Sequence, residues 1–319
     1  MSLPAPGLQL IKPGPRSLIQ DRGRMGYQHQ GLATGGPADY QAFRWANRLL
    51  DNDPGCACLE ITLGGFEATA LCRMSLAVTG AAATILINNS AHPGNATLEV
   101  RAGDTIRLEA PRAGLLSYLA VAGGWQTTTF LGSRSVVMRE HLAGLAPARA
   151  GDCLPCKPQP PHRDARVPAP ALIDYQEPVE LRILPTAQTM LFSQQDRRTL
   201  TAREYRISPH SDRMGYRLSG PPLASGPGGI VSEAIPLGSI QIPGDGQPLI
   251  LLSDRQTIGG YPKIGAISLL DCSRLAQRRP GSTASFRWSD LAQCRQERNE
   301  FEQLLTRELT SGTHKAQHY

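Results

Sequence analysis

A cluster of prolines divides this chain into two parts. Seven prolines lie between Cys153 and Pro178, at positions 155, 158, 160, 161, 168, 170 and 178. Proline fixes its own φ angle and lacks an amide hydrogen, so this density excludes regular helix or sheet. We predict a semi-rigid connector at residues 156–178, between an N-terminal domain at 1–155 and a C-terminal domain at 179–319. The length of 319 residues also favours two domains.

Both predicted domains have the sequence pattern of β structure. Short apolar runs are bounded by Gly, Asn, Asp or Pro, which is typical of a sandwich or barrel. The chain contains 32 Gly and 26 Pro, a composition that favours turns and short elements over long helices. The clearest runs begin at Cys58, Ser75, Ala83, Thr105, Gly114, Val179, Ser239, Pro248, Ile264 and Thr283.

Two helices are predicted. The first begins near Pro37 or Asp39 and places Phe43, Ala46 and Leu50 on one face, and we expect it to close one end of a barrel. The second closes the chain, with Ser289 as a plausible N-cap. Its apolar residues recur at helical spacing and predict packing against the core: Leu291, Cys294, Phe301, Leu304 and Leu305.

Charge and hydropathy exclude several classes of function. The formal net charge is +6, but the arginines are scattered and never form a basic run, which argues against nucleic-acid binding and favours anionic small ligands or acidic partners. No window reaches the roughly 18 apolar residues of a membrane span, and the N-terminus lacks the apolar core of a signal peptide. We therefore expect a cytoplasmic protein.

Cysteines and known motifs add few candidates. Seven cysteines are an odd number in a chain large enough to fold without disulfides, so we expect free thiols, and we interpret Cys153 and Cys156 as incidental rather than zinc-binding. The chain lacks the GxxxxGK[ST] and GxGxxG nucleotide motifs, the HExxH metal motif and an Ala-Met-Lys-Met biotin-attachment sequence.

Three segments concentrate polar side chains among glycines. The first, "QDRGRMGYQHQGLATGGPAD", contains Gln20, Asp21 and Arg24, and its glycines allow the backbone to approach a ligand closely. The second, "SPHSDRMGYRL", contains Arg213 and Tyr216. A serine triad there is disfavoured because Ser208 does not lie in a Gly-x-Ser-x-Gly elbow, so a guanidinium binding a carboxylate or phosphate is the better interpretation.

The third segment is "LLSDRQTIGGYPKIG". Its apolar strand leads into Asp254 and Gln256, and a glycine turn then leads into Tyr261 and Lys263. Catalytic groups are commonly presented in this way, on a loop held by rigid structure. A hairpin with a solvated tip is the structural alternative.

At these same segments the sequence resembles a known family. The blocks "QDRGRMGYQHQG", "GGPAD", "LEITLGG", "YLAVAGG", "SDRMGYRLSG" and "GSIQIPGDGQPLILLSDRQTIGGYPKIGAI" resemble the biotin-dependent carboxyltransferase family, also called allophanate hydrolase subunit 2-like. The resemblance covers most of the chain and is closest to the C subunit of 5-oxoprolinase, the Kip antagonist type. It implies β-barrel domains, at least one of them cyclophilin-like.

The resemblance also implies activity, partners and cofactors. It implies a cytoplasmic hetero-oligomer with the A and B subunits of 5-oxoprolinase, the latter Kip-inhibitor-type, that uses ATP to open 5-oxo-L-proline to L-glutamate. Two alternatives remain open. One is biotin-dependent carboxyl transfer to a urea or amide, with biotin carried by another protein. The other is a non-catalytic regulator of the Kip-inhibitor-type partner.

Site residues are expected from side-chain chemistry and from position in these motifs. Asp254 and Gln256 are expected to hold the amide, and Lys263 with Tyr261 to steady developing negative charge. The expected catalytic set is Asp254, Gln256, Lys263 and Asp21, the last as candidate base. The expected substrate- or phosphate-binding set is Arg24, Arg213, Tyr216, Tyr261 and Gln20. No metal site is expected.

Overall fold

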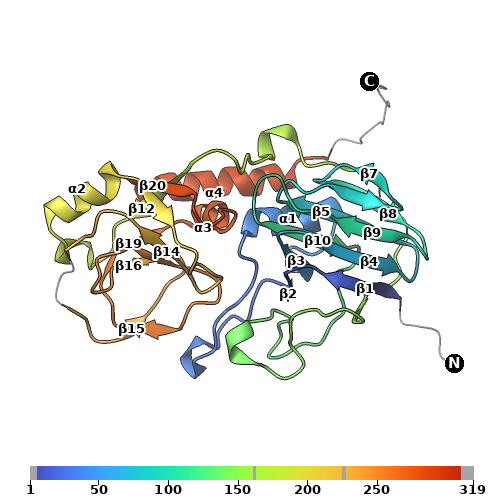
Figure 1. Ribbon diagram of the computed structural model, residues 1–319, viewed down its shortest axis with the longest axis horizontal. Coiled ribbons are helices and arrows are strands. Elements are labelled where there is room, and N and C mark those ends of the chain that lie inside the picture. The colour runs from blue at the N-terminus through green and yellow to red at the C-terminus, as the bar shows by residue number, and fades with distance from the viewer. Residues whose placement is uncertain (1–5, 161–162, 225–227, 310–319) are drawn as a thin grey trace.

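The computed structural model describes residues 6–160, 163–224 and 228–309, and over these ranges the chain is mainly β, as predicted (Figure 1). Two sheets coloured blue to green occupy one end of the elongated molecule, and a barrel coloured yellow to orange occupies the other. Pro161 of the predicted connector and the outermost residues of both predicted domains lie outside the described residues.

The N-terminal part folds as two antiparallel sheets. The six-stranded sheet has the order β11-β1-β4-β9-β6-β7, and the five-stranded sheet has the order β2-β3-β10-β5-β8. One apolar core contains residues of both sheets, such as Phe66 and Ile106 from the first and Leu59 and Leu119 from the second. The strands are β1 (Gly7–Pro13), β2 (Arg16–Gln20), β3 (Cys58–Thr62), β4 (Phe66–Ala70), β5 (Met74–Gly80), β6 (Ile85–Ile87), β7 (Ser90–His92), β8 (Ala96–Val100), β9 (Thr105–Leu108), β10 (Leu116–Val121) and β11 (Cys153–Pro155).

The C-terminal part contains a closed seven-stranded barrel of the order β12-β19-β16-β17-β14-β13-β20, in which the parallel pairing of β12 with β20 contributes to closure. A separate two-stranded sheet pairs β15 with β18. The barrel has its own apolar core, which includes Leu181, Ile240 and Ile250. The strands are β12 (Val179–Leu184), β13 (Tyr205–Ile207), β14 (Gly215–Ser219), β15 (Glu233–Ala234), β16 (Ser239–Gln241), β17 (Leu249–Leu251), β18 (Ile258–Gly259), β19 (Lys263–Ile267) and β20 (Thr283–Trp288).

A third core joins the two parts. Along β10, Leu119 faces the core between the sheets, whereas Tyr118 and Ala120 face the other side of the sheet and pack against helices. Those helices bring Phe43 and, from the C-terminal part, Leu270 and Phe301 into the same cluster. The helices are α1 (Tyr40–Leu49), α2 (Gln194–Ala202), α3 (Leu269–Ala276) and α4 (Leu291–Thr306), with short 3-10 turns η1 (Gln28–Gln30), η2 (Met138–Glu140), η3 (Ala169–Ala171) and η4 (Thr189–Leu191).

The first helix differs from its prediction in what it covers. Asp39 is the N-cap of α1 and accepts a hydrogen bond from the Ala42 amide, so the predicted start is confirmed. The prediction that this helix closes one end of a barrel was wrong. Its apolar side lies on β5 and β10 of the five-stranded sheet and on α3 and α4. Both faces of the five-stranded sheet are apolar, so the face that points away from the six-stranded sheet also has to be covered.

The last helix begins one residue later than predicted. Asp290, and not Ser289, is the N-cap of α4, because its carboxylate accepts the Gln293 amide at 2.9 Å. No helix within the three described ranges combines the length and the apolar character that a membrane crossing requires.

The proline-rich segment follows the surface of the N-terminal sheets. β11 pairs with β1, and further along an isolated bridge joins Arg166 to Ala96. Ala165 and Val167 are buried in the third core. Prolines are therefore scattered along this segment, and single residues between them pair with the N-terminal sheets. These pairings attach the segment to the rest of the protein.

Candidate functional site

Arg213 of the second polar segment lies in a buried ion-pair cluster between the two parts of the chain. Its guanidinium binds both oxygens of Asp254, at 2.9 and 2.8 Å, and the Glu60 carboxylate of β3 at 2.6 Å. It also donates to the Gly36 carbonyl at 2.6 Å. The structure thus brings together residues from all three polar segments, with Glu60 as a partner that the sequence did not reveal.

The cluster continues through Tyr118. Its hydroxyl donates to Glu60 at 2.7 Å and accepts the Asp39 amide at 2.7 Å. Burial alone would lower the pKa of Arg213, but attraction to Asp254 and Glu60 raises it above its ordinary value. Burial raises the pKa of Asp254, and the adjacent Arg213 opposes this. Since internal partners occupy the Arg213 fork, this arginine positions the two parts and is not open to a ligand.

Asp39 extends the polar cluster towards the connector. One of its oxygens accepts the Tyr175 hydroxyl at 3.0 Å and the Gln277 amide at 2.8 Å. Burial raises the pKa of this carboxyl, although its hydrogen bonds oppose the shift. Asp39 therefore links α1, the connector and the end of α3.

The expected residues of the N-terminal glycine loop form a separate cluster. The Asp21 carboxylate accepts the hydroxyls of Ser133 and Ser135 at 2.6 and 2.7 Å. It also accepts the amides of Gly23 and Arg134. Because four donors surround its oxygens, Asp21 holds the segment around residues 133–135 against the loop.

Gln20 and Arg24 belong to the same cluster. Gln20 donates to the Val136 carbonyl and accepts the Gly36 amide. Arg24 donates to the carbonyls of Phe130 and Ser135 and lies over the Phe130 ring, 5.5 Å from its centre. Burial lowers the pKa of Arg24. These contacts make the cluster a loop anchor, and it meets the Arg213 cluster at Gly36, whose amide donates to Gln20 and whose carbonyl accepts from Arg213.

A third group of polar side chains lies between the barrel and the β15–β18 pair. Lys263 of β19 is buried and pairs with Glu233 of β15, which also accepts the Gln188 amide at 2.7 Å. Hydrogen bonding to Lys263 lowers the pKa of Glu233. Gln241 of β16 is the register partner of Lys263, so the two side chains start from neighbouring positions on the barrel wall.

Gln241 has the most unusual environment in this group. It is 0% exposed, and neither its amide nitrogen nor its oxygen has a hydrogen-bond partner among the described residues. An unsatisfied buried polar group costs about 1–3 kcal/mol, so such a group points to a role outside folding.

Glycine at position 259 allows a second carboxamide to approach Gln241. A Cβ placed there would lie 3.2 Å from the Gln241 amide nitrogen, 3.3 Å from that of Gln256 and 2.6 Å from Ile235. Gln256 and Tyr261 are exposed on either side of this turn. The structure therefore brings Gln256, Tyr261 and Lys263 around one turn, and Gln241 and Glu233 join them.

The remaining expected residue lies away from this turn. The Tyr216 hydroxyl is buried and donates to the Ala276 carbonyl at 3.0 Å, and burial raises its pKa. It fastens β14 to the end of α3. The structure contains no disulfide between the seven cysteines, and no group of three or more His, Cys, Asp or Glu side chains in the described part of the chain is arranged to hold a metal ion.

Three comparisons place the chain among known proteins. A protein of Haemophilus influenzae, named as the C subunit of 5-oxoprolinase, is 33% identical over 274 residues, which are 85% of this chain and 87% of that protein. Urea amidolyase of Saccharomyces cerevisiae is 26% identical over 307 residues, 88% of this chain but 16% of that protein. The solved structure of the protein TTHA0988 matches with a TM-score of 0.82 at 34% identity, over 90% of this chain and 57% of that one.

The chain thus spans little more than half of TTHA0988 and nearly the whole of the Haemophilus influenzae protein. The family model described as "Carboxyltransferase domain, subdomain A and B" matches residues 30–288, which include both parts of the fold and all the clusters above except the first residues of the glycine loop. This chain belongs to that carboxyltransferase-domain family.

Proposed function

We propose that this chain is the C subunit of an ATP-dependent 5-oxoprolinase, which opens 5-oxo-L-proline to L-glutamate together with an A subunit and with a Kip-inhibitor-type B subunit. The extent of the similarity carries this proposal. The match includes 87% of a relative that is itself named as this component, whereas it includes 16% of urea amidolyase.

The reaction has a clear chemical requirement. The net change adds one water across the lactam C–N bond, and a second water is consumed as ATP becomes ADP and phosphate. A lactam carbonyl is a poor electrophile, and transfer of a phosphoryl group to its oxygen makes attack by water feasible. The protein groups needed are therefore ones that hold an amide edge and stabilise negative charge on the former carbonyl oxygen.

The turn at Gly259 supplies such groups. A lactam presents one N–H donor and one C=O acceptor on the same edge, and the unpartnered Gln241 carboxamide offers the complementary pair. Lys263 lies at the neighbouring register position and carries the positive charge, and exposed Gln256 adds a second carboxamide. Because Gln241 is fully buried, substrate entry requires the β15–β18 pair to move and Lys263 to exchange Glu233 for the substrate.

The other expected residues then have positioning roles. Arg213 and Asp254 hold the two parts of the chain in register, and Asp21, Arg24 and Gln20 anchor the glycine loop. All five are buried and hydrogen-bonded to other parts of the chain, although Nη1 of Arg24 has no partner among the described residues.

Carboxyl transfer to a urea or amide is the second candidate. It is favoured by the family description and by the similarity to urea amidolyase. The same amide-binding pair would hold urea, and the biotin would come from another protein. A purely regulatory partner of the Kip-inhibitor-type protein would need neither Gln241 nor Lys263 for its effect.

The test is an activity assay on the complex. The chain is co-expressed with the A and B subunits, and ATP-dependent release of glutamate from 5-oxoproline is measured. Lys263→Met is expected to lower the rate about 100-fold, because it removes a charge that stabilises the transition state. Lys12→Met is the matched control, since Lys12 forms an exposed ion pair with Glu67 far from the turn.

The outcomes separate the candidates. No glutamate release from the wild-type complex contradicts the proposed activity, and biotin-dependent consumption of ATP with urea establishes the second candidate instead. Full activity of the Lys263 variant would leave the 5-oxoprolinase proposal in place but refute the site.

A further inference from the structure

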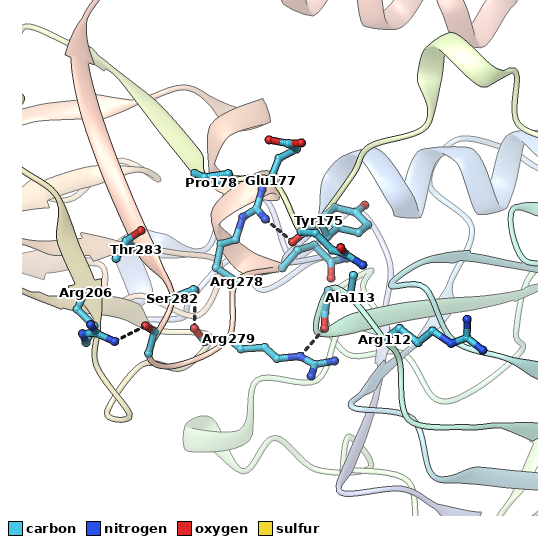
Figure 2. Close-up of a pocket in the computed structure, with 14 residues that line it drawn as sticks. Arg112, Ala113, Tyr175, Glu177, Pro178, Arg206, Arg278, Arg279, Ser282 and Thr283 are labelled. Atoms are coloured by element: carbon cyan, nitrogen blue, oxygen red, sulfur yellow. Dashed lines mark hydrogen bonds between the residues drawn. The ribbon is translucent and has the colours of Figure 1, made fainter.

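A pocket of about 560 Å³ lies between the two parts of the chain, and none of the residues that line it belongs to the Gly259 turn (Figure 2). Its wall comes from the loop before β10, from the end of the connector, from β13 and from the segment between α3 and β20. Four arginines line it: Arg112, Arg206, Arg278 and Arg279.

The charge of this pocket is not balanced. Glu177 is the single carboxylate in the lining, so four guanidiniums leave an excess of three positive charges. None of the four arginines forms an ion pair with a carboxylate within residues 6–160, 163–224 and 228–309. Glu177 and Asp174 act on Arg278 only through longer-range attraction. This pattern differs from Arg213, whose charge is matched by two carboxylates.

Backbone carbonyls hold three of these arginines in place. Arg279 donates to the carbonyls of Gly114 and Pro111, and Arg206 donates to that of Gly281 at 2.8 Å, as Figure 2 shows for Arg206. Arg278 donates to the Tyr175 carbonyl. Carbonyls orient a guanidinium without neutralising it, so the positive charge is fixed in position before any ligand arrives.

Arg278 supplies a second, independent sign of a ligand. The side chain is only 6% exposed, and its Nε has no partner in the described part of the chain. Burial lowers its pKa, which shows that the charged form is poorly solvated. A buried cation with an unused donor at the wall of a pocket gains both a hydrogen bond and a counter-charge from a bound anion.

We propose that this pocket binds the phosphoryl groups of a small phosphate-bearing molecule. Arg278 and Arg279 are its fixed donors, and the exposed Arg112 and Arg206 complete the counter-charge. Phosphoryl groups fit better than a lone carboxylate, because one carboxylate balances only one of the three excess charges. The site is separate from the Gly259 turn. Ligand binding to it is measured on this chain alone and does not depend on 5-oxoprolinase activity.

Titration calorimetry on the full chain tests the proposal with inorganic phosphate, pyrophosphate and ATP as probes. We expect saturable binding of pyrophosphate. ATP binding more tightly than pyrophosphate identifies a nucleotide as the source of the phosphoryl groups, and equal binding identifies the phosphate groups alone.

Charge reversal locates the bound phosphate. Arg112→Glu with Arg206→Glu changes two exposed side chains and is expected to weaken pyrophosphate binding about 100-fold. Arg101→Glu with Arg298→Glu makes the same change of net charge at exposed positions outside the pocket, and is expected to leave binding within about twofold.

A conservative variant tests the buried donor. Arg278→Lys keeps the charge but removes the unpartnered Nε, so pyrophosphate binding is expected to weaken about tenfold. Absence of saturable binding by the wild-type chain, or equal weakening by both double variants, would overturn the proposal.

Discussion

The guanidinium of Arg213 is fixed by four hydrogen bonds to three groups, which come from both parts of the chain. Asp254 follows a barrel strand, Glu60 lies in β3 and Gly36 lies in the N-terminal loop. Gly36 has a φ of 87°, a conformation that residues with a Cβ rarely adopt, and this lets its carbonyl face the arginine. A charge buried this deeply is stabilised only by the oppositely charged and hydrogen-bonding groups around it.

Removing Arg213 should therefore be costly. Arg213→Leu leaves Asp254 and Glu60 buried without a counter-charge, and we expect a loss of about 3–5 kcal/mol in the free energy of unfolding. Arg217→Leu is the matched control, because Arg217 pairs with Asp245 at the surface and should contribute less than about 1 kcal/mol. Urea unfolding of both variants measures the difference. Similar losses in the two would contradict the assigned role.

Asp39 gives the stability a defined dependence on pH. A carboxyl whose folded pKa lies above its unfolded value of about 3.9 binds more protons when folded, so its contribution to stability falls as pH rises from about 4 through the folded pKa. Asp39→Asn cannot ionise. Relative to the wild type, it should therefore gain stability between about pH 5 and about pH 8.

Thermal unfolding at those two pH values checks this expectation. Asp290→Asn serves as control, because Asp290 caps α4 in the same way but is exposed. A stability difference between Asp39→Asn and wild type that is the same at both pH values would show that burial does not govern this carboxyl.

Helices α1 and α4 connect the two parts at the level of elements. The rings of Tyr40 and Phe301 lie 6.1 Å apart, and Arg44 of α1 binds Glu302 of α4. Although α4 follows the barrel in sequence, its buried residues Phe301 and Leu305 belong to the third core beside the N-terminal sheets (Figure 1).

Truncation at this contact should destabilise the whole protein. Phe301→Ala removes a buried ring and is expected to cost about 3 kcal/mol in the free energy of unfolding. Leu291→Ala, at the exposed start of the same helix, should change it by less than about 0.5 kcal/mol. Urea unfolding followed by circular dichroism measures both. A small effect of Phe301→Ala would show that α4 packs loosely.

The sequence pattern predicted the strands better than it predicted which residues lie together at the candidate sites. Runs such as those at Cys58 and Thr105 became β3 and β9, because apolar residues bounded by turn formers have few other ways to be buried. Helix α2 was missed because only Asp196 and Leu200 of its residues are buried, so it has no apolar stripe. Its capping box at Ser193 was the available signal.

The candidate sites were predicted only in part, for a related reason. Glu60 and Gln241 are polar residues within strands whose residues are all buried, and a local pattern cannot tell a solvent-facing polar residue from one covered by another layer. Which layer covers them depends on contacts between distant segments. The glycine-rich turn at Gly259 was recognisable, but its partner Gln241 was not.

At the scale of the whole molecule, three polar features differ in chemistry: the junction around Arg213, the polar group at the Gly259 turn and the arginine pocket. The junction around Arg213 fixes the two parts relative to each other. In the proposals above, the group at Gly259 binds an amide on the barrel and the arginine pocket binds an anion between the two parts. The proposed function requires the group at Gly259 to hold an amide.

The Gln241→Met variant tests that requirement most directly, in the complex with the A and B subunits. We predict that glutamate release from 5-oxoproline falls about 100-fold, while the chain becomes about 1 kcal/mol more stable because two unsatisfied buried polar atoms are removed. Gln195→Met, at an exposed position on α2, should change neither. Undiminished glutamate release by the Gln241 variant would contradict the account.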